Sequence, residues 1–179
     1  MRVFVPATMR MLQTLVDEGQ FSPISRTAFA VTPTLREAYV SGDDDELADV
    51  ALREAARASL RLIGGEPDLD SDHDGDADEV ADATPSFRRV VIAADVDPVT
   101  LRPDLDDAVV RLPAPLSLTE VAAVHVDLAA AESAVSAAVA AVDAADLGDP
   151  DAEFVLGDVE DHELAWYAPQ EIPFLLELL

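Results

Sequence analysis

The sequence predicts an α/β protein: a single domain over residues 1–179, with a mixed or parallel sheet of about five or six strands and helices packed on it. A chain of 179 residues suits one hydrophobic core. Short aliphatic runs alternate along it with segments of helical periodicity. Half of the residues are hydrophobic but only 5% are aromatic, so we expect a core of small, closely packed side chains.

The predicted strands are short runs of β-branched and aromatic residues. One run contains Val90, Val91 and Ile92 in succession, which is typical of a strand covered on both faces and therefore central in the sheet. The strands are expected at residues 2–5, 27–31, 88–96, 108–112, 123–126 and 162–167.

The predicted helices begin at recognisable capping residues. Thr8 and Thr32 are suitable N-caps, Pro33 fits a first helical position, and acidic residues at 43–46 favour the positive end of a helix. The alanine-rich segment is expected to lie flat on the sheet, because Ser133 and Ser136 allow close approach. The helices are expected at residues 9–19, 33–39, 43–63, 117–120 (one turn) and 128–145, with another beginning near 149–150.

Residues 64–86 differ in composition from the rest of the chain. They contain nine acidic and no basic residues, with few large aliphatics, and we predict a flexible acidic insertion within the domain. Alternating carboxylates around Gly75 fit the first half of a calcium loop, although its twelfth position is Ala81, not glutamate. Weak calcium binding is the only cofactor hypothesis, against a plain solvated run. The candidate ligands are Asp70, Asp72, Asp74, Asp76 and Asp78.

The net charge is -26, and all 11 basic residues are arginine. The absence of lysine is typical of a GC-rich genome. So acidic a chain is a poor partner for nucleic acid or an anionic membrane. No apolar stretch is long enough for a membrane span, and the first residues do not resemble a signal peptide, so we expect a cytoplasmic protein. Without cysteine there is no disulfide, thiolate nucleophile or cysteine zinc site.

Six blocks that span most of the chain carry a family resemblance: MRVFVPAT, TAFAVTPTLREAY, EAARASLRL, RRVVIAADV, AAVHVD and ELAWYAPQEIP. Together they resemble an uncharacterised family of small acidic actinobacterial proteins, a domain of unknown function. The resemblance implies a cytoplasmic actinobacterial source. It implies no reaction, ligand or catalytic residue.

Three arginines recur at helical spacing. Arg53, Arg57 and Arg61 share one helix face, where they could bind a phosphate or the carboxylates of a partner. Alternatively, they pair with neighbouring acidic side chains of the same chain or hold two copies together.

The C-terminal block brings histidine, carboxylates and large aromatics into ten residues. A general base could be built from His162 and Glu163. The alternative is that Trp166 and Tyr167 anchor the last strand in the core or at an interface, with Glu171 beside them.

A second histidine lies in a predicted strand. His125 and Asp127 are two residues apart, so they share a face of that strand and could form a catalytic or metal-binding pair. The alternative is a buried or edge histidine satisfied by a carboxylate.

No motif identifies a reaction, so whether the protein is an enzyme stays open. The leading hypothesis is a non-enzymatic protein-interaction or regulatory module that presents the aromatic block and the arginine-bearing helix to a protein partner or a second copy. The first alternative is a small enzyme that uses His125 or His162 with nearby carboxylates. The second is weak calcium binding by the acidic segment.

Overall fold

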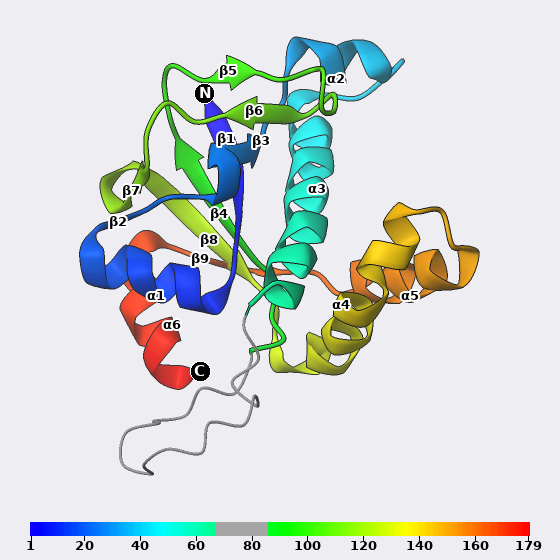
Figure 1. Cartoon of the computed structure of the whole chain (residues 1–179). Helices are drawn as coiled ribbons and strands as arrows, with labels where there is room; N and C mark the ends of the chain where they lie inside the picture. Colours follow the sequence, from blue (N-terminus) through cyan, green and yellow to red (C-terminus); the bar gives the residue numbers. More distant parts are fainter. Residues whose placement is uncertain (67–85) are drawn as a thin grey trace.

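The computed structural model describes residues 1–66 and 86–179 (Figure 1). A seven-stranded sheet in the order β5-β6-β3-β1-β4-β8-β9 forms its centre, and β2 and β7 form a separate two-stranded sheet. The strands are β1 (Arg2–Ala7), β2 (Gln20–Phe21), β3 (Thr27–Phe29), β4 (Val90–Asp95), β5 (Thr100–Leu101), β6 (Val109–Arg111), β7 (Leu116–Ser117), β8 (Val121–Val126) and β9 (Ala165–Tyr167). The helices are α1 (Met9–Glu18), α2 (Pro33–Ala38), α3 (Asp44–Gly64), α4 (Glu132–Asp146), α5 (Pro150–Glu160) and α6 (Ile172–Leu178). Single 3₁₀ turns occupy Ile24–Arg26, Leu118–Glu120, Ala129–Ala131 and Pro169–Glu171.

The expected mixed or parallel sheet of five or six strands is wrong in direction and size. Every neighbouring pair in the seven-stranded sheet is antiparallel. Because β1 is antiparallel to both β3 and β4, those two strands run in the same direction, joined through α2 and α3. The helical connection thus links parallel strands, as the alternation of elements suggests, but β1 lies between them. Local pattern does not reveal such an inserted strand.

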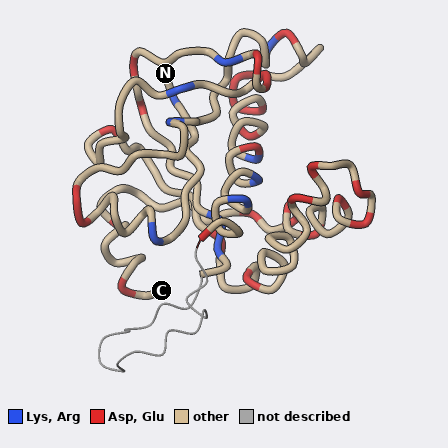
Figure 2. The backbone as a smooth tube through the Cα atoms, viewed as in Figure 1, with Lys and Arg blue, Asp and Glu red and all other residues tan. Residues whose placement is uncertain are grey.

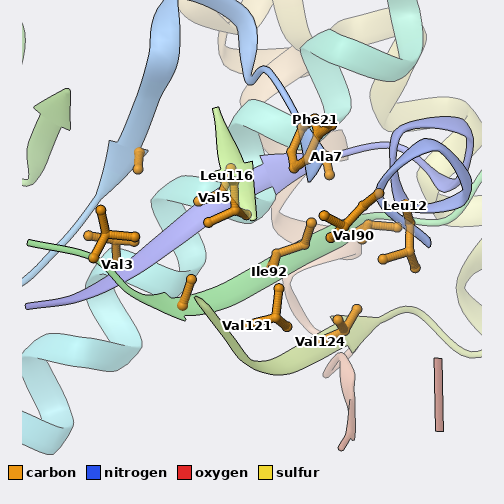
Figure 3. Packing of buried hydrophobic residues seen from close by; sticks show 14 of the residues in the cluster. Val3, Val5, Ala7, Leu12, Phe21, Val90, Ile92, Leu116, Val121 and Val124 are labelled. Atoms are coloured by element: carbon orange, nitrogen blue, oxygen red, sulfur yellow. The ribbon is translucent and has the colours of Figure 1, made fainter. Parts of the chain in front are cut away.

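The two faces of the sheet are covered by different helices (Figure 1). On one face, Val3 and Val5 of β1 pack with buried side chains of α1 and α6. Figure 3 shows part of this cluster, including Leu12 of α1. On the other face, Phe4 and Val91 pack against α3. The prediction that residues 90–92 form a central strand covered on both faces is confirmed.

Three of the predicted helix starts are confirmed at the atomic level, whereas the helix expected from residue 128 begins at Glu132, after a 3₁₀ turn. The Thr8 side chain accepts a hydrogen bond from the backbone N–H of Met11 at 3.2 Å, and Thr32 accepts one from Leu35 at 3.0 Å. Asp43 caps α3 and accepts from the backbone of Asp45 and Glu46. These are local interactions, which is why sequence alone locates them.

The expectation that the alanine-rich helix lies flat on the sheet is wrong. Helices α4 and α5 form a hairpin beside the C-terminal half of α3 (Figure 1), where their buried side chains share a cluster with Leu60 and Ile63. Ser133 and Ser136 are exposed. The small residues of α4, among them Ala138 and Ala145, therefore allow close packing between helices.

Four elements were absent from the prediction: β2, β5, β7 and α6. The three strands have two residues each, too few for a recognisable alternation. Helix α6 comes from a short, almost continuously apolar segment. The last strand is shorter than expected, because regular pairing begins only at Ala165. None of the described helices has both the length and the apolar character needed to cross a membrane.

Candidate functional site

A buried ion pair fixes one end of the sheet. Arg89 directly precedes β4 and Asp127 directly follows β8, and the register that pairs Val90 with Val126 brings them opposite each other. Nε and Nη2 of Arg89 each donate to the Asp127 carboxylate at 2.8 Å, and the Arg89 backbone N–H donates to it at 2.8 Å. The side chains are only 3% and 0% exposed. Both charges are removed from water, so the loss of either partner would leave the other charge buried and uncompensated.

The same arginine holds the connection between α5 and β9. Nη2 of Arg89 donates to the backbone carbonyl of His162 at 2.7 Å. The neighbouring Arg88 donates from Nε to Glu132 at 2.8 Å and from Nη1 to the backbone carbonyl of Asp127 at 3.3 Å. The two arginines thus tie the start of β4 to the end of β8, the start of α4 and the loop before β9.

A cavity of about 410 Å³ opens beside this ion pair. Its walls come from α3 (Asp49, Leu52, Arg53 and Ala56), from Arg89, from Glu160 at the end of α5, and from residues 161–164 of the connection between α5 and β9. The volume lies within the range of small-molecule sites, roughly 300–1,000 Å³. Four of its lining residues are acidic: Asp49, Glu160, Asp161 and Glu163.

Strand β9, at the edge of the sheet, begins directly after the last residue that lines this cavity. Leu164 lines the cavity and packs with the cluster on the α3 side of the sheet, and Trp166, two residues farther along the chain in β9, lies on the same face. Trp166 is opposite His125 in the register of β8 and β9, and its side chain is 60% exposed. Tyr167 instead packs against the cluster on the other face. Of the two aromatics, Trp166 is the one presented to solvent.

The proposed pair of His125 and Asp127 is not formed, since the hydrogen bonds of the Asp127 carboxylate are to Arg89. His125 is half-buried between β4 and β9. Burial lowers the pKa of His125, the charge of Arg2 lowers it further, and Asp49 opposes the shift. His162 and Glu163 both line the cavity, where His125 is not among the lining residues. A general-base role for either histidine stays a prediction.

The three arginines of α3 have different surroundings. Arg57 contacts Asp146 at 3.1 Å and Glu153 at 2.8 Å, and Arg61 contacts Asp146 at 2.7 Å. These bonds join α3 to the α4–α5 hairpin, which carries acidic but no basic residues (Figure 2). The Arg61 and Arg57 guanidinium groups lower the pKa of Asp146, and the hydrogen bond from Arg57 lowers that of Glu153.

Arg53 makes no hydrogen bond or ion pair within residues 1–66 and 86–179. It lies on the exposed side of α3 and lines the cavity. Of the three arginines singled out by spacing, it is therefore the one with a guanidinium available to a ligand.

Glu171, the remaining predicted partner-binding residue, has a local role. Its carboxylate accepts a hydrogen bond from the backbone N–H of Ala168 at 2.7 Å, which caps the turn before α6. Binding of a partner by Glu171 stays a prediction.

The calcium hypothesis concerns Asp70, Asp72, Asp74, Asp76 and Asp78, all of which lie outside the described residues, like most of the predicted insertion at 64–86. In the part of the chain that the structure describes, no group of three or more histidine, aspartate or glutamate side chains is arranged to hold a metal ion.

Sequence reasoning missed Arg89, which lines the cavity, and the acidic lining residues Asp49, Glu160 and Asp161. One signal was present: adjacent arginines, Arg88 and Arg89, at the start of a strand expected to be central. A charge at the end of such a strand is drawn into the protein interior and needs a partner. The partner, Asp127, could be identified only once β4 and β8 were known to be neighbours.

These features define a mixed α/β protein with an antiparallel sheet and an acid-lined cavity, part of whose lining directly precedes the last strand, β9. The chain belongs to a family of unknown function, DUF6912, whose model matches residues 1–176. The expectation of an uncharacterised domain family is thereby confirmed. No curated protein and no solved structure gives a significant match.

Proposed function

We propose that the protein is a non-enzymatic binding module that receives a positively charged, extended segment of a protein partner at β9. The observation that carries this proposal is the exposure of Trp166, at 60%, on the last strand of the sheet beside an acid-lined cavity. Tryptophan is among the residues most enriched at the centres of interfaces.

The position of β9 supports strand addition. In the described part of the chain β9 pairs only with β8, so its outer edge presents unpaired main-chain groups. An extended peptide can add to such an edge by main-chain hydrogen bonds, while side-chain contacts provide selectivity. With three residues in β9, the main-chain pairing is short, and the Trp166 side chain must contribute much of the affinity.

The negative charge of the cavity and of the whole chain supports a partner segment that is basic. Asp49, Glu160, Asp161 and Glu163 line the neighbouring cavity, and the whole chain carries a net charge of -26. A negative surface speeds the encounter with a basic segment. A guanidinium or ammonium group can also lie over the face of an exposed indole. The same charge disfavours a second copy as the occupant, because two such faces repel each other.

The experiment uses Trp166 as its own reporter, since it is the only tryptophan in the chain. A short peptide of alternating arginine and valine should shift tryptophan emission to shorter wavelength, and added salt should weaken the effect. The matching peptide of glutamate and valine should have no effect.

Two variants distinguish specific binding from general attraction. Trp166→Ala should reduce the affinity for a labelled basic peptide at least about tenfold, which is about 1.4 kcal/mol. Phe174→Ala removes another exposed aromatic, 67% exposed on α6, and should leave affinity unchanged. Equal losses for both variants, no response to the basic peptide, or dimerisation that buries Trp166 would each contradict the proposal.

A further inference from the structure

We infer that the cavity between α3 and the connection from α5 to β9 binds a small zwitterionic molecule, with its carboxylate at Arg89 and Arg53 and its cationic group near the acidic lining residues. This inference goes beyond the proposed function, because it concerns a small ligand and does not involve Trp166. The chemistry of the ligand follows from the residues that line the cavity.

The first step is the orientation of Arg89. Its Nε and Nη2 atoms are occupied by Asp127 and the His162 carbonyl, while Nη1 makes no hydrogen bond to the described residues. In the same part of the chain no buried side-chain nitrogen or oxygen lacks a partner, so Nη1 must be accessible. Arg89 is 3% exposed and lines the cavity, so we infer that the small accessible area of Nη1 faces the cavity.

The second step is the identity of the group that fits there. Asp127 holds the Nε–Nη2 edge of Arg89 and the His162 carbonyl holds Nη2, so Nη1 is a preorganised, charge-assisted donor that needs little ordering on binding. Arg53 lines the same cavity and has no ion-pair partner among the described residues. Two guanidinium groups of this kind match the oxygens of a carboxylate.

The third step is the charge of the remainder of the ligand. Asp127 neutralises the charge of Arg89. The remaining charged side chains of the lining are therefore one cation, Arg53, and four carboxylates, those of Asp49, Glu160, Asp161 and Glu163. A simple anion would therefore meet net repulsion, and a simple cation would leave the Arg89 donor unused. A molecule with both charges satisfies both parts of the cavity.

The fourth step is size. A cavity of about 410 Å³ accommodates a molecule of amino-acid size, and Leu52, Ala56 and Leu164 provide apolar surface for an aliphatic chain. A basic amino acid has this combination: a carboxylate, a short aliphatic chain and a distal cation. We use L-arginine and L-lysine as probes of this class.

The experiment compares each probe with the same molecule lacking its carboxylate. Calorimetric titration of the full chain with L-arginine and L-lysine should give saturable binding, with a corresponding rise in Tm. Agmatine and cadaverine, the decarboxylated counterparts, should bind at least about tenfold more weakly. Glutarate, which has no cationic group, should also bind at least about tenfold more weakly.

Arg53→Gln should weaken binding of L-arginine about tenfold. Arg111→Gln is the matched control, because Arg111 lies in β6 toward the opposite end of the sheet and outside the cavity. Both variants should fold, and a Tm near that of the parent chain checks this. Trp166→Ala should retain L-arginine binding, which separates this inference from the proposed function.

Three results would overturn the inference. They are the absence of binding for both amino acids at roughly millimolar concentration, equal binding of the decarboxylated compounds, and equal weakening by Arg53→Gln and Arg111→Gln.

Discussion

At the scale of single residues, the buried pair of Arg89 and Asp127 has the largest expected effect on stability. Asp127→Ala would leave the Arg89 guanidinium buried without its counter-charge, at 3% exposure. We expect a loss of about 3–5 kcal/mol in the free energy of unfolding, measured by urea denaturation.

The double variant Arg89→Met with Asp127→Leu tests the same interpretation from the other side. Because it removes both charges and retains apolar volume, it should recover most of that loss. It also removes the bond from Arg89 to the His162 carbonyl and the donor facing the cavity, so binding of L-arginine should disappear even where stability returns. A loss of less than about 1 kcal/mol in the free energy of unfolding for Asp127→Ala alone would contradict the buried-charge argument.

At the scale of elements, the α4–α5 hairpin has its own hydrophobic cluster and is joined to α3 partly by ion pairs. Asp146 contacts both Arg57 and Arg61, so Asp146→Asn should destabilise the contact between hairpin and α3 by about 1 kcal/mol. We expect faster hydrogen exchange in residues 132–160, with little change in β1 and β4. Asp143→Asn, also on α4, is the control because Asp143 has no ion pair among the described residues.

The pH dependence of this contact follows from the lowered pKa of Asp146 and Glu153. A carboxyl group whose pKa is lower in the folded state stabilises the fold above its unfolded pKa, near 4, and this contribution disappears as the pH falls through the folded pKa. The parent chain should therefore lose hairpin protection below about pH 4, and Asp146→Asn should lose less. An identical acid response in both proteins would contradict the assignment.

Prediction from sequence succeeded for elements that are defined locally. Helix α1 begins after Thr8 and ends before Gly19, which has φ +75°, and both signals lie within the helix and its caps. Strand order depends on pairing between distant segments, such as Val5 with Ile92. The packing of α4 on α3 was not predictable either, because small side chains permit a helix to approach a helix as closely as a sheet.

The candidate site likewise combines residues that local sequence could single out with one that depends on long-range strand pairing. Trp166 and Arg53 could be singled out as residue types at a given spacing, and they border and line one cavity. Arg89 joins them only through the long-range register of β4 and β8. Arg57 and Arg61 have the same helical spacing as Arg53, and their different surroundings follow from the position of the hairpin.

At the scale of the whole molecule, the net charge of -26 should control how stability depends on salt. Raising the salt concentration from about 0.01 M to about 0.15 M reduces the Debye length from about 30 Å to about 8 Å. This screens repulsion across the acidic surface, while the ion pairs lost to screening are mostly exposed and individually weak. We expect Tm to rise over this range in scanning calorimetry, and a fall in Tm would contradict the dominance of net charge.

The place of β1 has a consequence for synthesis on the ribosome. This strand is translated before β3 and β4, between which it lies, and β4 follows only at Val90–Asp95. Until Val90–Asp95 has emerged from the exit tunnel, one edge of β1 has no neighbouring strand, and Val3 and Val5 lack their packing contacts with β4. A nascent chain that stalls before Val90 should therefore depend on chaperones, because the sheet cannot form on both sides of β1 until Val90–Asp95 has been translated.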